Sequence, residues 1–226
     1  MSPTSIESTH SSDDGVREDR IRLLRERSIS VVLDVGANAG QYARRLREDG
    51  FSGTIISFEP LRDAYDQLRT AAEHDPNWHT VNTALAESPG VATINVSANS
   101  YSSSFLPVTN ASLDAAPDAA YVGTESVNVT ALDLLDIPPG PKMLKADVQG
   151  TEPSVLRGAR RQLPGIDLVE LEMSLVPIYE GQELAPAVCA LLRDFGFVPV
   201  ALEVSFINPD TGEILCVDGI FANACN

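Results

Sequence analysis

The sequence predicts an α/β fold in which helices cover both faces of a mostly parallel sheet. Short apolar runs alternate with amphipathic helical patterns from Val31 to Phe195, which is typical of parallel strands joined by crossover helices. The last two apolar runs begin at Phe197 and Ile214, and the turn signal NPDTGE at Asn208–Glu213 joins them. We therefore expect a parallel sheet that ends in an antiparallel C-terminal hairpin.

Length and composition fit one domain, residues 16–226, behind a polar tail. The chain has 226 residues, of which 43% are hydrophobic, which suffices for one core and is short for two. Residues 1–15 are too polar to offset the entropy of ordering, so we expect them to be disordered. A short helix is expected over Val16–Arg27, and we interpret its arginines as a solvated face. They are Arg17, Arg20, Arg22, Arg25 and Arg27.

Charge and cysteine usage exclude several classes of protein. A formal net charge of -16 argues against binding nucleic acid or an anionic membrane surface, because both need clustered cations. No apolar run approaches the roughly 20 residues of a membrane span, and no signal peptide is evident, so we expect a cytoplasmic protein. Cys189, Cys216 and Cys225 are widely spaced and suggest neither a disulfide framework nor a zinc site.

The expected elements follow the alternation in order. The strands are short apolar runs, and the helices have apolar residues at helical spacing. Predicted strands are Val31–Val35, Thr54–Phe58, His79–Leu85, an extra edge strand from Gly90, Lys142–Asp147, and runs from Asp167, Phe197 and Ile214. Predicted helices are Gly40–Glu48, Arg62–Glu73, Glu152–Leu163 and Leu184–Phe195. Residues 98–121 are too polar for a regular core element, and we interpret them as a binding loop or lid.

The segment VVLDVGANAGQYARRL, residues 31–46, predicts a strand that ends in a ligand-binding loop. Gly36 and Gly40 can adopt backbone angles denied to other residues, and the following helix offers unpaired amide groups. Glu59 ends the next strand about 20 residues later, where an acid can accept both hydroxyls of a ribose. A helix cap or a surface carboxylate is the structural alternative for Glu59. The combination predicts a nucleoside-like ligand.

Asn38 narrows the choice of ligand. It replaces the second glycine of the dinucleotide fingerprint, and its side chain would crowd a pyrophosphate. No P-loop lysine follows, so S-adenosylmethionine fits better than NAD or ATP. Asp34, at the end of the strand, either receives the methionine ammonium group or is a carboxylate satisfied by loop amides.

Charged residues lie on two strands expected to be neighbours. Strand alternation places Lys145 and Asp147 on one face, and it aligns Glu170 with Glu172. We expect Lys145 to pair with Glu170 or Glu172, which leaves Asp147 at the open end of its strand beside the ligand.

Asp147 is the leading candidate for the base or orienting group, with Glu172 second. Methyl transfer to a neutral hydroxyl needs in-line placement and usually a base. The three histidines, His10, His74 and His79, are better explained as structural or surface residues. We expect no metal site, because the segment EMSLVP offers Glu172 without a second strong ligand.

Seven motifs resemble those of the FkbM-like methyltransferases in order and spacing. They are LDVGANAGQYA, ISFEP, NTALAE, SSSF, VTALDLL, LKADVQGTEPSVLRGA and LVELEMS. The similarity spans about residues 31–221, and its most diagnostic parts are the block Lys145–Ala159 and the Gly36-x-Asn38-x-Gly40 loop. It implies a Rossmann-like class I methyltransferase with seven strands that uses S-adenosylmethionine. The implied acceptor is a hydroxyl of a polyketide, or of a sugar in a glycolipid or secondary metabolite.

The resemblance also implies residue roles. It assigns the cofactor loop, the ribose acid, the adenine wall and the methyl-facing acid, which are Asp34, Gly36, Asn38, Gly40, Glu59, Ala84, Leu85 and Asp147. Gln149 stands where the family often has glutamate, which weakens any base or metal role there. The serine run with Tyr101 and Phe105 is either a wall for a sugar or a solvated loop.

Two other functions stay open from the sequence. One is an NAD-dependent oxidoreductase, and the other is a non-catalytic protein that binds an adenosyl ligand. The acceptor is expected to be a small molecule or a glycolipid, and a homodimer is one option for the assembly.

Overall fold

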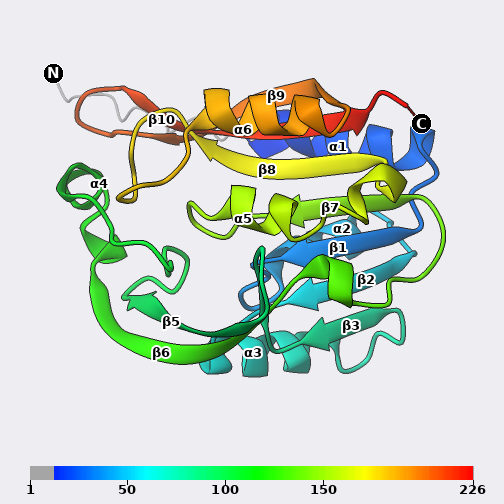
Figure 1. Cartoon of the computed structure of the whole chain (residues 1–226), viewed down its shortest axis with the longest axis horizontal. Helices are drawn as coiled ribbons and strands as arrows, with labels where there is room; N and C mark the ends of the chain where they lie inside the picture. Colours follow the sequence, from blue (N-terminus) through cyan, green and yellow to red (C-terminus); the bar gives the residue numbers. More distant parts are fainter. Residues whose placement is uncertain (1–12, 226) are drawn as a thin grey trace, which may run out of the picture.

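A computed structural model describes residues 13–225 and contains two sheets (Figure 1). The larger sheet has seven strands in the order β3-β2-β1-β7-β8-β10-β9. They are β1 Val31–Val35, β2 Thr54–Phe58, β3 Trp78–Val81, β7 Lys142–Ala146, β8 Leu168–Ser174, β9 Phe197–Ile207 and β10 Ile214–Asn223. Strand β10 is antiparallel to β8 and β9, and the other pairings are parallel. This confirms the predicted sheet and its C-terminal hairpin.

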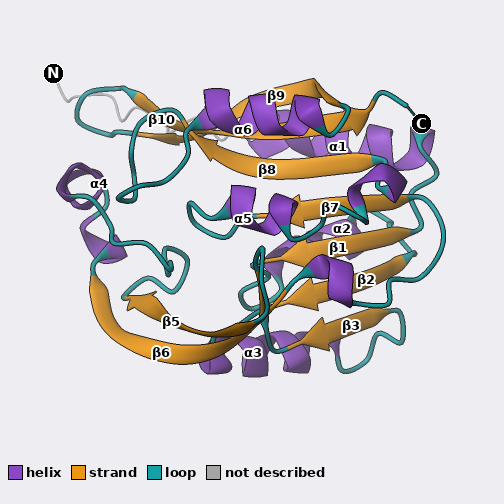
Figure 2. Cartoon of the chain, in the orientation of Figure 1, coloured by secondary structure: helices purple, strands orange, loops and turns teal. Residues whose placement is uncertain are grey.

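Helices pack on both faces of the larger sheet (Figure 2). One face is covered by α1 Asp13–Glu26, α2 Gln41–Glu48 and α3 Arg62–Ala72, and the other by α5 Glu152–Arg157 and α6 Ala185–Asp194. Strand β1 is buried along its whole length: Leu33 contributes to the α5 and α6 side, and Val32 to the α1 to α3 side. A central parallel strand needs apolar residues on both faces, which explains why all residues of β1 except Asp34 are apolar.

The smaller sheet differs from the sequence-based expectation. It consists of β4 Ala84–Leu85, β5 Gly90–Ser97 and β6 Tyr121–Thr130, in the order β4-β6-β5. The strand predicted over 79–85 is therefore divided between the two sheets, and the strand from Gly90 is not an edge of the larger one. Strand β6 was not predicted, because among its ten residues Val127 alone is buried and no apolar alternation marks it.

Two helices also differ from the prediction. Helix α4, Asn110–Ala115, lies inside the segment expected to be irregular. Helix α5 ends at Arg157 and not near Leu163, with Gly158 as its C-cap; Gly158 packs so closely against the end of β4 that an added Cβ would lie 2.0 Å from the Ala86 carbonyl oxygen.

Disorder was predicted for residues 1–15. Residues 1–12 lie outside the described residues, and α1 begins at Asp13, so residues 13–15 belong to a helix. Within the described range, no helix combines the length and apolarity that crossing a membrane would require.

Candidate functional site

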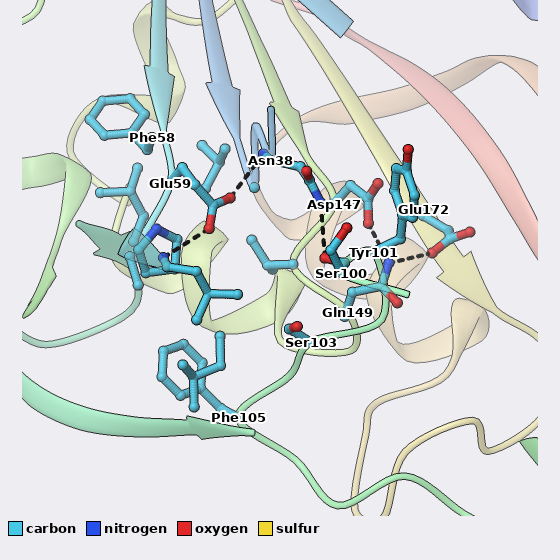
Figure 3. A pocket seen from close by; sticks show the side chains of 18 residues that line it. Asn38, Phe58, Glu59, Ser100, Tyr101, Ser103, Phe105, Asp147, Gln149 and Glu172 are labelled. Atoms are coloured by element: carbon cyan, nitrogen blue, oxygen red, sulfur yellow. Dashed lines mark hydrogen bonds between the residues drawn. The ribbon is translucent and has the colours of Figure 1, made fainter. Parts of the chain in front are cut away.

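Three adjoining cavities open at the carboxyl ends of β1, β2, β7 and β8, and Figure 3 shows the first of them. We name each after one residue in its wall: the Glu59 cavity of about 270 Å³, the Tyr179 cavity of about 290 Å³ and the Lys145 cavity of about 320 Å³. Tyr101 and Glu172 line all three. Open α/β folds bind ligands at this edge of the sheet. The cavities therefore lie around Tyr101 and Glu172 at the edge where a ligand is expected.

The loop after β1 takes the conformation that its glycines predict. Gly36 and Gly40 have φ angles of 75° and 86°, and Asn38 also has a positive φ of 48°. An added Cβ at Gly36 would lie 1.9 Å from the Asp147 carbonyl oxygen, and one at Gly40 would lie 2.8 Å from the Trp78 ring. The absence of side chains at both glycines therefore lets the loop pack closely against Asp147 and Trp78, and it leaves the loop backbone accessible to a ligand.

Glu59 fixes the loop to the end of β2. Its Oε2 accepts a hydrogen bond from the Asn38 backbone N–H at 2.8 Å, and its Oε1 accepts one from the Leu61 N–H at 2.9 Å. The side chain is buried in the wall of the Glu59 cavity, and this burial raises its pKa to about 7. Sequence analysis brought together the loop and this acid, and the structure places them in direct contact (Figure 3).

The far end of the Glu59 cavity is apolar. Ala84 and Leu85 of β4 are buried there, and they share the wall with Phe58, Leu61 and Ile94. The cavity therefore has an apolar end, a carboxylate in its middle and a polar end next to Asn38.

Asp34 lies beneath the cavities and does not line them. Its side chain is fully buried, and its Oδ2 accepts a hydrogen bond from Ser57 at 2.9 Å. Its Oδ1 has no hydrogen-bond partner, and Lys145 Nζ lies 3.4 Å away. Burial raises the pKa of Asp34, and the Lys145 ammonium opposes that shift. Lys145 is opposite Glu170 in the strand register but lies closest to Asp34, so the predicted pairing with Glu170 or Glu172 is wrong.

Arg20 explains why Glu170 is not available to Lys145. The guanidinium of Arg20 forms a bidentate ion pair with Glu170, at 2.7 Å and 2.5 Å, and Tyr42 donates a third hydrogen bond to that carboxylate at 2.9 Å. Arg20 is buried, so the prediction that all the arginines of α1 form a solvated face is wrong at this position. The periodicity of α1 gives no sign of a partner 150 residues away.

The three cavities together form one cleft. Asp147 follows β7, and its side chain extends into this cleft beside Gln149. Gln149 Nε2 donates a hydrogen bond to Asp147 Oδ1 at 2.6 Å and a longer one to Glu172 Oε2 at 3.3 Å (Figure 3). The Asp147 side chain is 40% exposed, and its Oδ2 lies 3.9 Å from Lys145 Nζ. One amide group thus connects the two carboxylates that sequence analysis selected for chemistry.

Glu172 is surrounded by other carboxylates. Burial raises its pKa well above the usual value, and the negative charges of Asp147, Asp218 and Glu152 add to the shift. Burial likewise raises the pKa values of Glu152 and Asp218 to about 7. The cleft therefore holds carboxyl groups that bind protons near neutral pH.

The serine loop, residues 97–105, covers the cleft. Asn38 Nδ2 donates to the Ser100 carbonyl at 2.9 Å, and Ser104 Oγ donates to the Gln149 carbonyl at 2.6 Å. Tyr179 OH donates to Gln149 Oε1 at 2.6 Å. The serine run was interpreted either as a wall for a sugar or as a solvated loop. The structure places it in the wall of the cavities. The role of Tyr179 and the bridging position of Gln149 were not predicted, since no local pattern links residues 30 positions apart.

The described residues contain no group of three or more His, Cys, Asp or Glu side chains placed to hold a metal ion. The carboxylates of the cleft are bound to amide, hydroxyl and ammonium groups of the chain.

Two solved methyltransferases have a similar fold. The magnesium protoporphyrin IX methyltransferase of Synechocystis, determined with bound SAM, aligns with a TM-score of 0.52 and 8% identity over 97% of this chain and 87% of that one. The precorrin-6y C5,15-methyltransferase of Geobacter metallireducens aligns with a TM-score of 0.50 and 11% identity over 97% of this chain and 93% of that one. These likenesses show the fold, which is that of the class I methyltransferases, as predicted.

Sequence comparison identifies the family. No curated protein sequence matches the chain significantly. Residues 34–199, most of the chain, match the methyltransferase FkbM domain, which confirms the resemblance drawn from the motifs. The chain therefore belongs to the FkbM family of methyltransferases.

Proposed function

We propose that this chain is an S-adenosylmethionine-dependent O-methyltransferase whose acceptor is a hydroxyl of a sugar, in a glycolipid or secondary metabolite, or of a polyketide. One observation carries the proposal: the Glu59 and Tyr179 cavities meet at Gln149 and Glu172, beside Asp147. A donor in one cavity and an acceptor in the other would face each other at these carboxylates. Proton acceptors at that point are what a hydroxyl nucleophile needs.

The residues of the Glu59 cavity fit the cofactor. Its apolar end, with Ala84 and Leu85, suits an adenine ring. Each oxygen of Glu59 accepts one backbone hydrogen bond and keeps a lone pair for a ribose hydroxyl. The loop of Gly36, Asn38 and Gly40 would lie under the amino-acid end. We assign Asp34 an indirect role, since it is buried under Lys145.

We assign the catalytic roles to Asp147 and Glu172. When bound, S-adenosylmethionine supplies an electrophilic methyl group on a sulfonium centre. Asp147 is the part of the network that reaches into the cleft, so it would orient the acceptor hydroxyl and hold its proton. Gln149 holds the Asp147 carboxylate through Oδ1, which leaves Oδ2 for the acceptor. The raised pKa of Glu172 suits a second proton carrier.

The hydroxyl-rich Tyr179 cavity supports a sugar-like acceptor. Its wall includes Ser102, Ser112, Ser174, Ser205 and Tyr179, and its described lining residues include no lysine, arginine or histidine. Such a surface can exchange hydrogen bonds with a polyol. Its volume of about 290 Å³ is near the lower end for small-molecule pockets, which suits one ring.

The position of Asn38 argues against the oxidoreductase alternative. Its side chain reaches over the loop to the Ser100 carbonyl, where a dinucleotide pyrophosphate would approach the backbone. We therefore expect S-adenosylmethionine and S-adenosylhomocysteine to bind in calorimetric titrations in which NAD does not.

The same protein should release S-adenosylhomocysteine when supplied with S-adenosylmethionine and a panel of sugars, glycolipids and polyketides. Micromolar binding of NAD without binding of the adenosyl ligands would reject the proposal. Binding of the adenosyl ligands without turnover of any acceptor would favour the non-catalytic alternative.

A further inference from the structure

Lys145 is a buried ammonium group that the proposed proton transfer does not use. The residue is 9% exposed and lines the Lys145 cavity. Its nearest acceptors in the described structure are the Gly36 carbonyl and Asp34 Oδ1, both at 3.4 Å, and Asp147 Oδ2 at 3.9 Å. Hydrogen bonds from N–H to oxygen are normally 2.7–3.2 Å long. All three contacts are therefore longer than a normal hydrogen bond, and the remaining contact of Nζ is with the face of the Tyr42 ring, 5.2 Å from its centroid.

The charge on Lys145 is maintained by its surroundings. Burial alone would lower its pKa, but the carboxylates of Asp34, Asp147 and Glu170 outweigh that effect and raise it. Asp34 and Asp147 form ion pairs with Lys145 at 3.4 Å and 3.9 Å, whereas Glu170 is bound by Arg20 and Tyr42. A buried cation whose contacts are all long has more to gain from a further acceptor than one that is already closely paired.

The position of the cavity indicates which acceptor that is. The Lys145 cavity shares Gly36, Asn38 and Asp147 with the Glu59 cavity, so it continues from the polar end of the latter. Neither the Glu59 nor the Tyr179 cavity has a lysine, arginine or histidine among its described lining residues. The Lys145 cavity has Lys145, Arg20 and Arg45 in its wall, together with the carboxylates of Asp147, Glu170, Glu172 and Asp218. Among the three cavities it is therefore the one whose described lining offers a cation to an anionic group, and Lys145 is the cation that no carboxylate binds at close range.

We propose that Lys145 binds the α-carboxylate at the amino-acid end of the cofactor, with Asp34 as its buried counter-ion. This inference rests on the proposed function, since it takes the ligand to be an adenosyl amino acid. It makes Lys145 a specificity residue for the amino-acid end, distinct from Glu59, which faces the ribose. It also revises the expected role of Asp34, which would act on the cofactor through Lys145 and not as a direct ligand of the ammonium group.

A ligand pair that differs in the amino-acid end tests the proposal. Calorimetric titrations would compare S-adenosylhomocysteine with 5′-methylthioadenosine, which lacks both the α-carboxylate and the α-ammonium group, on the wild type and on Lys145→Met. We expect Lys145→Met to weaken S-adenosylhomocysteine about 10- to 100-fold, as for the loss of a hydrogen-bonded charge. Binding of 5′-methylthioadenosine should be unchanged, and this would also show that the variant is folded.

Lys142→Met is the matched control, because Lys142 lies at the other end of β7 and its Nζ bonds the Gly140 carbonyl outside the cavities. It should leave both affinities unchanged. If Lys145→Met fails to fold, Lys145→Gln takes its place: the carboxamide of S-adenosylhomocysteine should bind the wild type about 10-fold more weakly than the acid, and this difference should disappear in the variant.

Three outcomes would overturn the proposal: equal weakening of both ligands by Lys145→Met, no weakening of either, or equal binding of acid and carboxamide to the wild type. No acceptor is present in these titrations, so an anionic acceptor cannot produce the expected difference. If neither adenosyl ligand binds the wild type, the proposed function fails together with this inference.

Discussion

The two sides of the cleft are built differently. On the Glu59 side, one carboxylate bonds two backbone amides, and apart from the serine loop every wall element belongs to a strand or to the short segment that follows it. On the Tyr179 side, side chains hold side chains: Gln149 connects Asp147, Glu172 and Tyr179, which come from separate parts of the chain. The first side is a rigid product of the sheet, and the second depends on a network of polar groups. Substitutions should therefore separate ligand binding from chemistry.

Asp147→Asn should show the largest separation. Asparagine keeps the size of the side chain but removes the charge that would accept a proton, so we expect turnover to fall about 100- to 10,000-fold. Affinity for S-adenosylhomocysteine should stay within about twofold, because Glu59 and the apolar wall are untouched. Initial rates of S-adenosylhomocysteine formation and calorimetric titration would measure the two quantities. Full turnover in this variant would reject Asp147 as the base.

Glu59→Ala should act on the other side, with a smaller effect. It removes the acceptor for the ribose hydroxyls and the bond to the loop at Asn38, so we expect cofactor binding to weaken by about 1 to 3 kcal/mol. The rate at saturating cofactor should change much less than in Asp147→Asn. Titration and the dependence of the rate on cofactor concentration would show this, and an unchanged affinity would remove Glu59 from the binding site.

The pH should move stability and cofactor affinity in opposite directions, with the smallest effect of the three. Burial raises the pKa of Glu59, Glu152 and Asp218 to about 7 from usual values of 4.5, 4.5 and 3.8. A raised folded-state pKa means that the folded chain binds more protons, so this contribution to stability is present at low pH and is lost as the pH rises through 7.

Melting temperature should therefore fall from about pH 4.5 to about pH 7 and level off above it. Affinity for S-adenosylhomocysteine should rise between about pH 6 and about pH 8, as Glu59 ionises, because only the ionised Glu59 accepts both ribose hydroxyls. Glu59→Gln is the control, since a side chain that does not titrate should flatten the affinity profile. Parallel pH profiles for melting and affinity in the wild type would contradict this account.

The difference between the Glu59 side and the Tyr179 side also explains which features could be predicted from the sequence. Strands β1 and β2 were predicted with the bounds that the structure shows, because burial on both faces leaves a continuous apolar run. The contact between the loop and Glu59 followed from spacing along neighbouring strands. The local rules that produced both predictions need only a few consecutive residues.

Features that depend on distant partners could not be predicted in this way. The pairing of Arg20 with Glu170 joins α1 to β8, and the contact of Tyr179 with Gln149 joins two loops. Strand β6 was not predicted, because Val127 alone among its residues is buried. Its pairing with β5 and β4 therefore leaves no apolar pattern in the sequence. The three-dimensional arrangement, and not the local sequence, selects these partners.

The ion pair of Arg20 with Glu170 has a consequence for fragments of this chain. The family match begins at residue 34, beyond α1, and ends at residue 199, before β10, which lies between β8 and β9. A fragment cut at those limits would lack α1, whose Arg20 covers and pairs with Glu170, and most of the central strand β1, and it would open the sheet beside β8. The smallest autonomous unit for expression or gene fusion therefore includes α1 and the C-terminal hairpin, and is longer than the region that defines the family.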